Sequence, residues 1–124
     1  MDLKLIRKIQ SVLRPELLSK KWQKYVKQYR LNKYAGHCYY ASEALYHLWG
    51  KSNGYRPRRV MVMSFDMGDQ MISHWYLQND KGKIIDITAK QFSNSVPYKD
   101  GKRAAFMTKT PSKHAKVLMN LIKK

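Results

Sequence analysis

Two alternating segments joined by a short polar connection constrain the fold of this chain most. Residues 58–65 and 71–78 are rich in β-branched, aromatic and methionine side chains, and residues 66–70 between them are polar. Such a pair predicts an antiparallel hairpin. A tight-turn sequence follows at 79–82, and residues 83–88 have the composition of a third strand. The sequence therefore predicts a small antiparallel sheet in the second half of the chain.

Apolar residues spaced three or four apart predict helices around this sheet. The expected helices cover residues 2–13, 15–30, 38–49 and 113–122. Pro15 interrupts the first pattern or opens the second helix, because proline suits a first helical turn. Gly50 is expected to end the third helix, and Ser112 or Thr110 to cap the fourth. The segments predicted as loops are 31–37, 51–56 and 93–105. Helices followed by hairpin-linked strands indicate an α+β domain.

The charge of the chain is unusual for a single domain of 124 residues. Its 25 Lys and Arg residues against eight Asp and Glu give a formal net charge of +17. A field of this sign attracts polyanions such as nucleic acid. The candidate phosphate contacts lie on the second predicted helix and are Lys20, Lys21, Lys24 and Lys27. The alternative is that this basic run is a solvated face over a packed aromatic stripe. We divide the domain into a basic helical N-terminal extension, residues 1–30, and a core, residues 31–124.

Cysteine content and hydropathy bear on the compartment. A single cysteine cannot form an internal disulfide, so nothing indicates an oxidising environment. No apolar run is long enough for a signal peptide or a membrane span. We therefore expect a cytoplasmic protein without a membrane partner.

That single cysteine, Cys38, stands at the predicted start of a helix. Backbone N–H groups and the helix dipole at such a position favour the thiolate, which is the nucleophilic form of a thiol. The alternative is a small buried hydrophobe, because free cysteine is among the most buried residue types.

Two residues downstream complete a possible catalytic set. His74 lies in the second predicted strand and Asp86 in the third, each about six residues from the turn between them. They can face each other across the hairpin, although a shift of one residue in register would separate them. A thiol followed by a histidine base and a carboxylate that orients it is an arrangement for acyl transfer.

Other polar and aromatic residues are candidates for lesser roles. The backbone N–H of Cys38 is a candidate oxyanion donor, and His37 and Trp75, which adjoin the proposed nucleophile and base, are candidate oxyanion or substrate-binding residues. His47 lies too far along its helix to touch Cys38. No recognised zinc-ligand spacing is present, so we expect no metal and no cofactor.

Three short motifs together resemble the small YunG-like proteins of bacteria and phages. They are Gly36-His37-Cys38, His74-Trp75-Tyr76-Leu77, and Ile85-Asp86-Ile87-Thr88 with Gln91-Phe92. The resemblance covers roughly residues 34–118 and implies a papain-like, NlpC/P60-like fold. In that fold the nucleophile helix packs on a small antiparallel sheet, and Cys38, His74 and Asp86 form the triad. It also implies Asn32 as an amide donor, at the offset from the cysteine that papain-like enzymes use.

The sequence leaves three functional hypotheses open. The first is a phage or bacterial thiol enzyme that hydrolyses an amide, peptide or thioester, or deamidates its substrate, in the host cytoplasm if phage-encoded. The second is a non-catalytic basic module that binds nucleic acid or an acidic host protein. The third is a structural protein of the virion.

Overall fold

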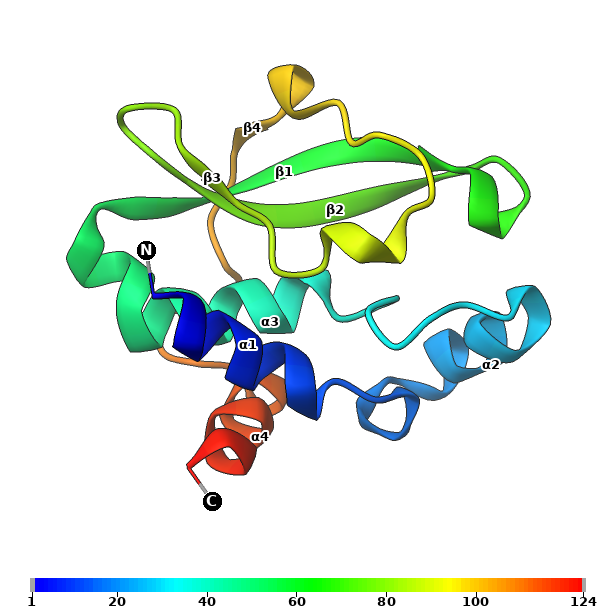
Figure 1. Ribbon diagram of the computed structural model, residues 1–124, viewed down its shortest axis with the longest axis horizontal. Helices are drawn as coiled ribbons and strands as arrows, with labels where there is room; N and C mark the ends of the chain where they lie inside the picture. Colours follow the sequence, from blue (N-terminus) through cyan, green and yellow to red (C-terminus); the bar gives the residue numbers. More distant parts are fainter. Residues whose placement is uncertain (1, 124) are drawn as a thin grey trace.

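A computed structural model describes residues 2–123 of the chain and shows an α+β architecture. Within these residues the α-helices are α1 (Leu3–Val12), α2 (Lys20–Tyr29), α3 (Cys38–Leu45) and α4 (Lys113–Ile122). The strands are β1 (Tyr55–Ser64), β2 (Gln70–Asn79), β3 (Ile84–Ile85) and β4 (Lys102–Arg103). They form one antiparallel sheet in the order β3-β2-β1-β4. The sheet lies over α3, with α1 and α4 beneath and α2 to one side (Figure 1).

The predicted hairpin is confirmed and is the longest feature of the sheet. β1 and β2 pair over their whole length, with Val60 opposite His74 and Met63 opposite Met71. Burial alternates along β1, as expected of a strand whose two faces meet different surroundings. Gly68 and Asp69 both have positive φ in the connection, which lets the chain reverse.

The main core lies between the helices and one face of the sheet. It gathers residues from α1, α3, α4, β2 and the start of β1. Ile6, Ile9 and Leu13 are buried in it, so α1 is part of the core rather than an extension of it. In contrast, α2 contains no buried residue. The boundary proposed at residue 30 therefore does not separate two packing units.

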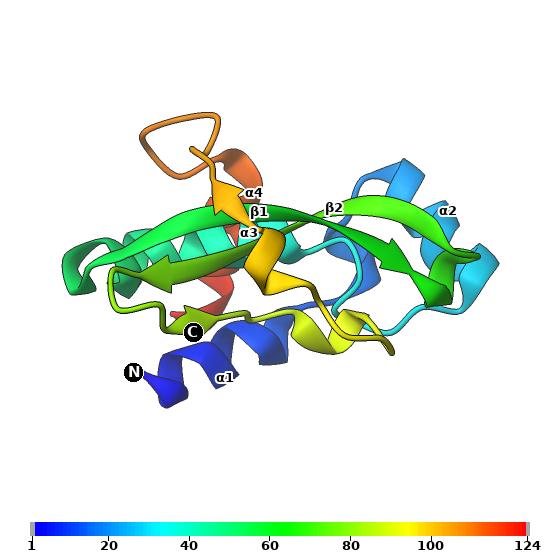
Figure 2. The same ribbon diagram turned by 90° about the horizontal axis from the view of Figure 1, so that it is seen from above.

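A second, smaller core covers the other face of the sheet. Val60, Val62, Tyr76 and Phe92 form it, and Val96 and Tyr98 pack against it. The segment that supplies Phe92, Val96 and Tyr98 crosses above the sheet (Figure 2). The sequence predicted a surface loop over residues 93–105, but Val96 and Tyr98 pack against the second core and cover it.

Several predicted boundaries were wrong. The third strand is only Ile84–Ile85, and β4 lies inside a segment predicted as a loop. The helix after Cys38 does not stop at Gly50: it leaves α geometry at Leu45, continues as a π-helical turn (Tyr46–Gly50) and ends in a 3₁₀ turn, after which Gly54 is left-handed at φ 80°. The predicted helix 15–30 is split by an extended Leu18 and Ser19, and Ser19 caps α2. Ser112 is confirmed as the N-cap of α4.

Candidate functional site

The thiol of Cys38 is carried by the first residue of α3. Gly36, two residues earlier, turns the chain at φ 82°, and a Cβ on it would come 3.0 Å from both Leu18 and Trp22. The side chains of Asp2, Ser19 and Ser112 cap the other α-helices, but His37 at the N-cap of α3 makes no side-chain cap hydrogen bond. The first N–H groups of a helix have no intrahelical partner, so the start of α3 keeps uncapped donors beside Cys38.

The start of α3 meets a part of β2 that no strand covers. β3 pairs only with Leu77 and Gln78, which leaves the preceding residues at the sheet edge. Cys38 Sγ lies 3.9 Å from the carbonyl oxygen of Ser73, and the Ser42 hydroxyl donates to the carbonyl oxygen of Trp75 over 3.3 Å. Side chains of α3 thus replace the missing strand. The brevity of β3 is what lets the thiol approach this edge.

His74 lies on the second-core face of β2 and is held by a carboxylate. Its Nε2 lies 2.7 Å from Asp86 Oδ2, and the hydroxyl of Tyr98 donates to the same oxygen over 2.7 Å. Asp86 follows β3 directly, and the strand register places it diagonally, rather than directly, opposite His74. Phe92 packs edge-on against the imidazole at 4.9 Å between ring centroids. Both side chains of the pair are almost fully buried.

The surroundings of His74 favour its protonated form. Burial by itself lowers the pKa of His74, but the hydrogen bond to Asp86 and the neighbouring Cys38 thiol outweigh it and raise the pKa to about 9. Nε2 is taken by Asp86, and Nδ1 is buried without a hydrogen-bond partner. Nδ1 is therefore the ring nitrogen left free to exchange a proton. Burial and the bond to Asp86 also raise the pKa of Tyr98, which keeps it a hydrogen-bond donor.

A small pocket gives access to the thiol. It measures about 180 Å³, and its lining includes Cys38, Ser73, Trp75, Trp22 and Gln91. The Cys38 residue is 8% exposed, so the pocket is the route by which a reagent reaches it. Gln91 is buried, and its Oε1 has no hydrogen-bond partner. An amide side chain therefore lies at the same pocket as the thiol.

The structure does not bring every candidate to this pocket. The amide of Asn32 donates to the carbonyl oxygen of Lys90 over 2.7 Å, and its side-chain oxygen accepts from Tyr34, so both ends hold the backbone. His37 is buried, and its Nε2 lies 3.0 Å from the carbonyl oxygen of Arg14. Burial outweighs that bond and lowers the pKa of His37 to about 4, so it is a neutral packing residue. Trp75 does line the pocket.

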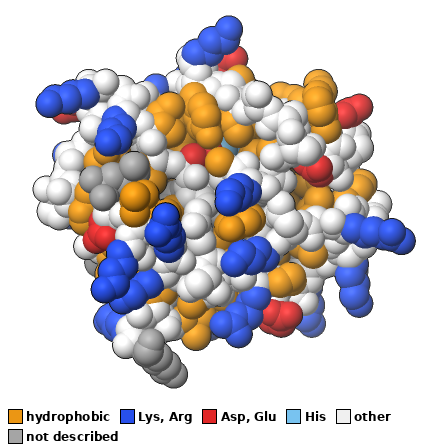
Figure 3. Space-filling model, viewed as in Figure 1, with side chains coloured by type: hydrophobic (Ala, Val, Ile, Leu, Met, Phe, Trp, Pro, Cys, Tyr) orange, Lys and Arg blue, Asp and Glu red, His pale blue; other side chains and the backbone are white. Residues whose placement is uncertain are grey.

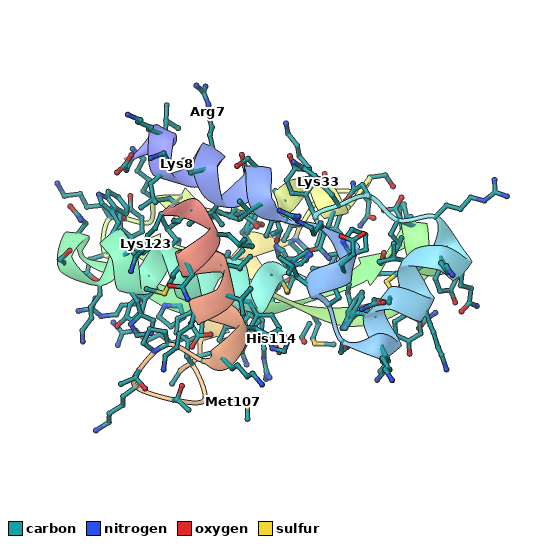
Figure 4. All side chains as sticks on the ribbon, turned by 90° about the horizontal axis from the view of Figure 1, so that it is seen from below. Arg7, Lys8, Lys33, Met107, His114 and Lys123 are labelled. Atoms are coloured by element: carbon teal, nitrogen blue, oxygen red, sulfur yellow. The ribbon has the colours of Figure 1, made fainter. Side chains whose placement is uncertain are left out.

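The basic residues proposed for phosphate contacts lie elsewhere. Lys20, Lys21, Lys24 and Lys27 are all exposed on α2. On the face that Figure 3 shows, Lys and Arg side chains are spread widely, with single acidic side chains between them. Arg7 of α1, for example, points away from the body of the molecule (Figure 4).

Two residues of the site escaped analysis of the sequence. Tyr98 lies in the segment predicted as a surface loop, and nothing in the local pattern indicated a contact with Asp86. Gln91 belongs to the Gln91-Phe92 motif, which was noted without a role. In the structure Phe92 packs on His74 and Gln91 lines the pocket, so both residues of the motif belong to the site.

Comparisons with known proteins add no constraint on the site. No family model matches the chain, and no curated protein or solved structure matches it. Within residues 2–123 no group of three or more His, Cys, Asp or Glu side chains could hold a metal ion. No helix in the same range is long and apolar enough to cross a bilayer. The resemblance in the motifs stays a prediction, and function has to be argued from the geometry.

Proposed function

We propose that this protein is a thiol enzyme of papain-like, NlpC/P60-like type that catalyses acyl transfer on an amide, peptide or thioester. One observation carries the proposal: Asp86 holds His74 through Nε2, and the nearby Cys38 thiol helps to raise the pKa of the same imidazole. A carboxylate, an imidazole and a thiol in this order serve to activate a nucleophile. A single cysteine, which has no disulfide partner, is consistent with an enzyme that acts in a reducing compartment such as the cytoplasm.

The reaction is inferred from the partners of the two ring nitrogens of His74. His74, whose surroundings favour its protonated form, already holds the thiol proton on Nδ1, and the Cys38 thiolate attacks the carbonyl carbon, forming a C–S bond while the carbonyl electron pair moves to oxygen. Collapse of this intermediate breaks the bond to the amine or thiol leaving group, which takes the proton from His74. Water, deprotonated by His74, then attacks the thioester and releases Cys38. Asp86 fixes the ring tautomer and stabilises the imidazolium at each stage.

The negative charge on the carbonyl oxygen requires donors that are already in place. The uncapped N–H groups at the start of α3 are next to the thiol, and the N–H of Cys38 itself is one of them. Gln91 adds a side-chain amide on another wall of the pocket. We assign the oxyanion site to these two donors in place of Asn32.

Trapping of the acyl intermediate tests this proposal. The protein is mixed with p-nitrophenyl acetate, an activated ester that needs no substrate recognition, and its intact mass is followed. We expect one acetyl group on Cys38, no labelling in Cys38→Ala, and strongly slowed labelling in His74→Gln. His47→Gln is the matched control, because His47 lies away from the thiol and should not affect the rate. Acetylation that persists in Cys38→Ala, or that is indifferent to His74→Gln, would overturn the proposal.

A second candidate function rests on a different observation. Within residues 2–123 no Lys or Arg lies within 4.0 Å of a carboxylate, so the cations of α2 are free to meet external anions. A protein that contacts phosphates in this way binds nucleic acid with an affinity that falls with salt, by roughly one power of salt concentration per contact. Replacing the four lysines of α2 by glutamine should reduce the slope of log affinity against log salt concentration by up to about four. The matched control replaces Lys4, Lys8, Lys81 and Lys83, which are equally exposed. Equal loss in both variants would show a diffuse charge effect instead.

A further inference from the structure

A second cavity, larger than the pocket at the thiol, lies elsewhere in the molecule. It measures about 520 Å³ and lies at the other end of the α3 segment, between the π-helical turn at Tyr46–Gly50, the start of β1 and the chain that follows β4. A cavity of this size can enclose a small organic ligand. Nothing in the thiol chemistry above uses it.

Four cations converge on this cavity from separate segments. Lys51 follows the π-helical turn, Arg56 is in β1, Arg103 is in β4, and Lys109 lies in the loop before α4. No acidic residue lines the cavity, and none of these four side chains forms an ion pair within residues 2–123. Unpaired cations at this density attract an anion, and guanidinium groups suit phosphate oxygens in particular.

Aromatic rings form another wall. Tyr46 and Phe106 both line the cavity, with their ring centroids 5.5 Å apart. Phe106 is fixed from behind, because it stacks on Trp75 at 5.5 Å between centroids and 20° between planes. Tyr39 also meets Phe106 edge-on, and its hydroxyl accepts a hydrogen bond from the Met107 N–H, which holds the loop that Figure 4 labels at Met107. A held ring of this kind can stack on a planar ligand.

The backbone at the cavity is also unusual. The π-helical turn brings Tyr46 and His47 to the lining, and turns of this type are rare and often found at functional sites. The Nε2 of His47 is buried and has no hydrogen-bond partner in the structure. Burial lowers the pKa of His47, so its imidazole stays neutral and can donate or accept one hydrogen bond.

We propose that this cavity binds a nucleotide, with phosphate among the four cations and the base against the Tyr46 and Phe106 rings. Bare phosphate would leave the aromatic wall unused, and an apolar ligand would leave the cations unused. A nucleotide matches both walls, whether it is a free mononucleotide or a unit of a single-stranded nucleic acid. The inference does not depend on thiol chemistry or on the lysines of α2.

Titration of the full chain with matched ligands tests the proposal. The probes are ADP, adenosine, pyrophosphate and a short oligothymidylate, measured by calorimetry at one low salt concentration. We expect ADP to bind more tightly than adenosine or pyrophosphate. Arg56→Gln combined with Arg103→Gln should weaken ADP binding about tenfold or more. Phe106→Leu should weaken the binding of ADP but not the binding of pyrophosphate. Lys81→Gln combined with Lys83→Gln, in the turn after β2, is the charge-matched control and should have no such effect. Melting curves establish that each variant folds.

The source of the nucleotide follows from the same data. Oligothymidylate that binds at least tenfold more tightly than ADP, and still requires Arg56 and Arg103, identifies single-stranded nucleic acid; equal or weaker binding identifies a free nucleotide. Pyrophosphate that binds as tightly as ADP, with no effect of Phe106→Leu, would overturn the proposal in favour of a plain anion site. Loss of binding in the α2 variant but not in the arginine variant would also overturn it, as would no binding of any probe. Acetylation of Cys38 by the ester should be unchanged in the arginine variant, which separates this result from the proposed enzyme activity.

Discussion

At the scale of single residues, the contacts of His74 are the main evidence for a site. Its ring is buried under Phe92, bound to Asp86 at one nitrogen and unpartnered at the other. A buried histidine that served packing alone would be expected to have both nitrogens satisfied or a lowered pKa, as His37 does. A buried ring with one free nitrogen and a raised pKa distinguishes His74 from a core residue.

The raised pKa of His74 predicts a pH dependence of stability. The folded state holds the His74 proton more tightly than an unfolded histidine, whose pKa is near 6.5. The stabilisation that protonated His74 gives the folded state is therefore complete below that pH. It is lost as the pH rises through about 9. We expect the free energy of unfolding to fall over this window by on the order of 3 kcal/mol. Urea titrations at a series of pH values from 6 to 10 measure this free energy.

His74→Gln should remove most of that slope, because glutamine does not titrate. His47→Gln should keep it, since burial lowers the pKa of His47 and moves its titration below the window. A wild-type profile as flat as that of His74→Gln would contradict the paired state of His74.

Tyr98 predicts a second residue-level effect. Its hydroxyl donates one of the two hydrogen bonds that Asp86 Oδ2 accepts. This hydrogen bond is stronger than one to a neutral acceptor, because the acceptor is a carboxylate. Tyr98→Phe should lower the free energy of unfolding by about 1–3 kcal/mol. Tyr25→Phe on α2 is the matched control and should change it little, because the Tyr25 hydroxyl makes no hydrogen bond within residues 2–123. Equal effects in chemical denaturation would show that Tyr98 does not hold Asp86.

At the scale of elements, a short strand and an uncapped helix create the site. Had β3 extended along β2, as the sequence predicted, it would have covered the edge that Cys38 and Ser42 now reach. The chain instead leaves the sheet at Asp86, which turns the carboxylate toward His74 and Tyr98.

The turn into α3 gives a prediction at this scale. Gly36 combines a positive φ with close contacts to Leu18 and Trp22, so a side chain there is both strained and crowded. Gly36→Ala should lower the free energy of unfolding by about 1–3 kcal/mol and slow labelling of Cys38, because the strain falls on the start of its helix. Gly54→Ala is the control: it has a similar φ but open space around it, so it should cost about 1 kcal/mol and leave labelling unchanged. Equal labelling in both variants would contradict a positioning role for Gly36.

Periodicity could predict the elements that depend on local pattern. The helices at residues 2–13 and 113–122, the Ser112 cap and the hairpin follow from spacing and capping residues alone. The short β3, β4 and the π-helical turn depend on contacts distant in sequence. So does the burial of Glu43, whose carboxylate accepts hydrogen bonds from the N–H and hydroxyl of Ser112 over 2.9 and 2.6 Å. The sequence identified the three residues of the proposed triad but neither Tyr98 nor the cavity at Tyr46.

At the scale of the whole molecule, the charge is large and internally uncompensated. With +17 formal charges and no Lys or Arg paired to a carboxylate within residues 2–123, the cations repel one another in the compact state. Salt screens this repulsion over about 10 Å at 0.1 M. We therefore expect the melting temperature to rise as sodium chloride is added, and to rise less in the variant with four glutamines on α2. A melting temperature that falls with salt would indicate attractive pairs of Lys or Arg with carboxylates, of which residues 2–123 show none.

We propose that His74 and Asp86 activate Cys38, and this activation can be measured as the rate of Cys38 alkylation by iodoacetamide as a function of pH. An ordinary thiol reacts in proportion to its ionised fraction and slows steeply below about pH 8.5. We expect the wild-type rate to stay high well below that pH and His74→Gln to restore the ordinary profile, with Asp86→Asn between the two. A wild-type profile that follows the ordinary thiol, unchanged in His74→Gln, would contradict it.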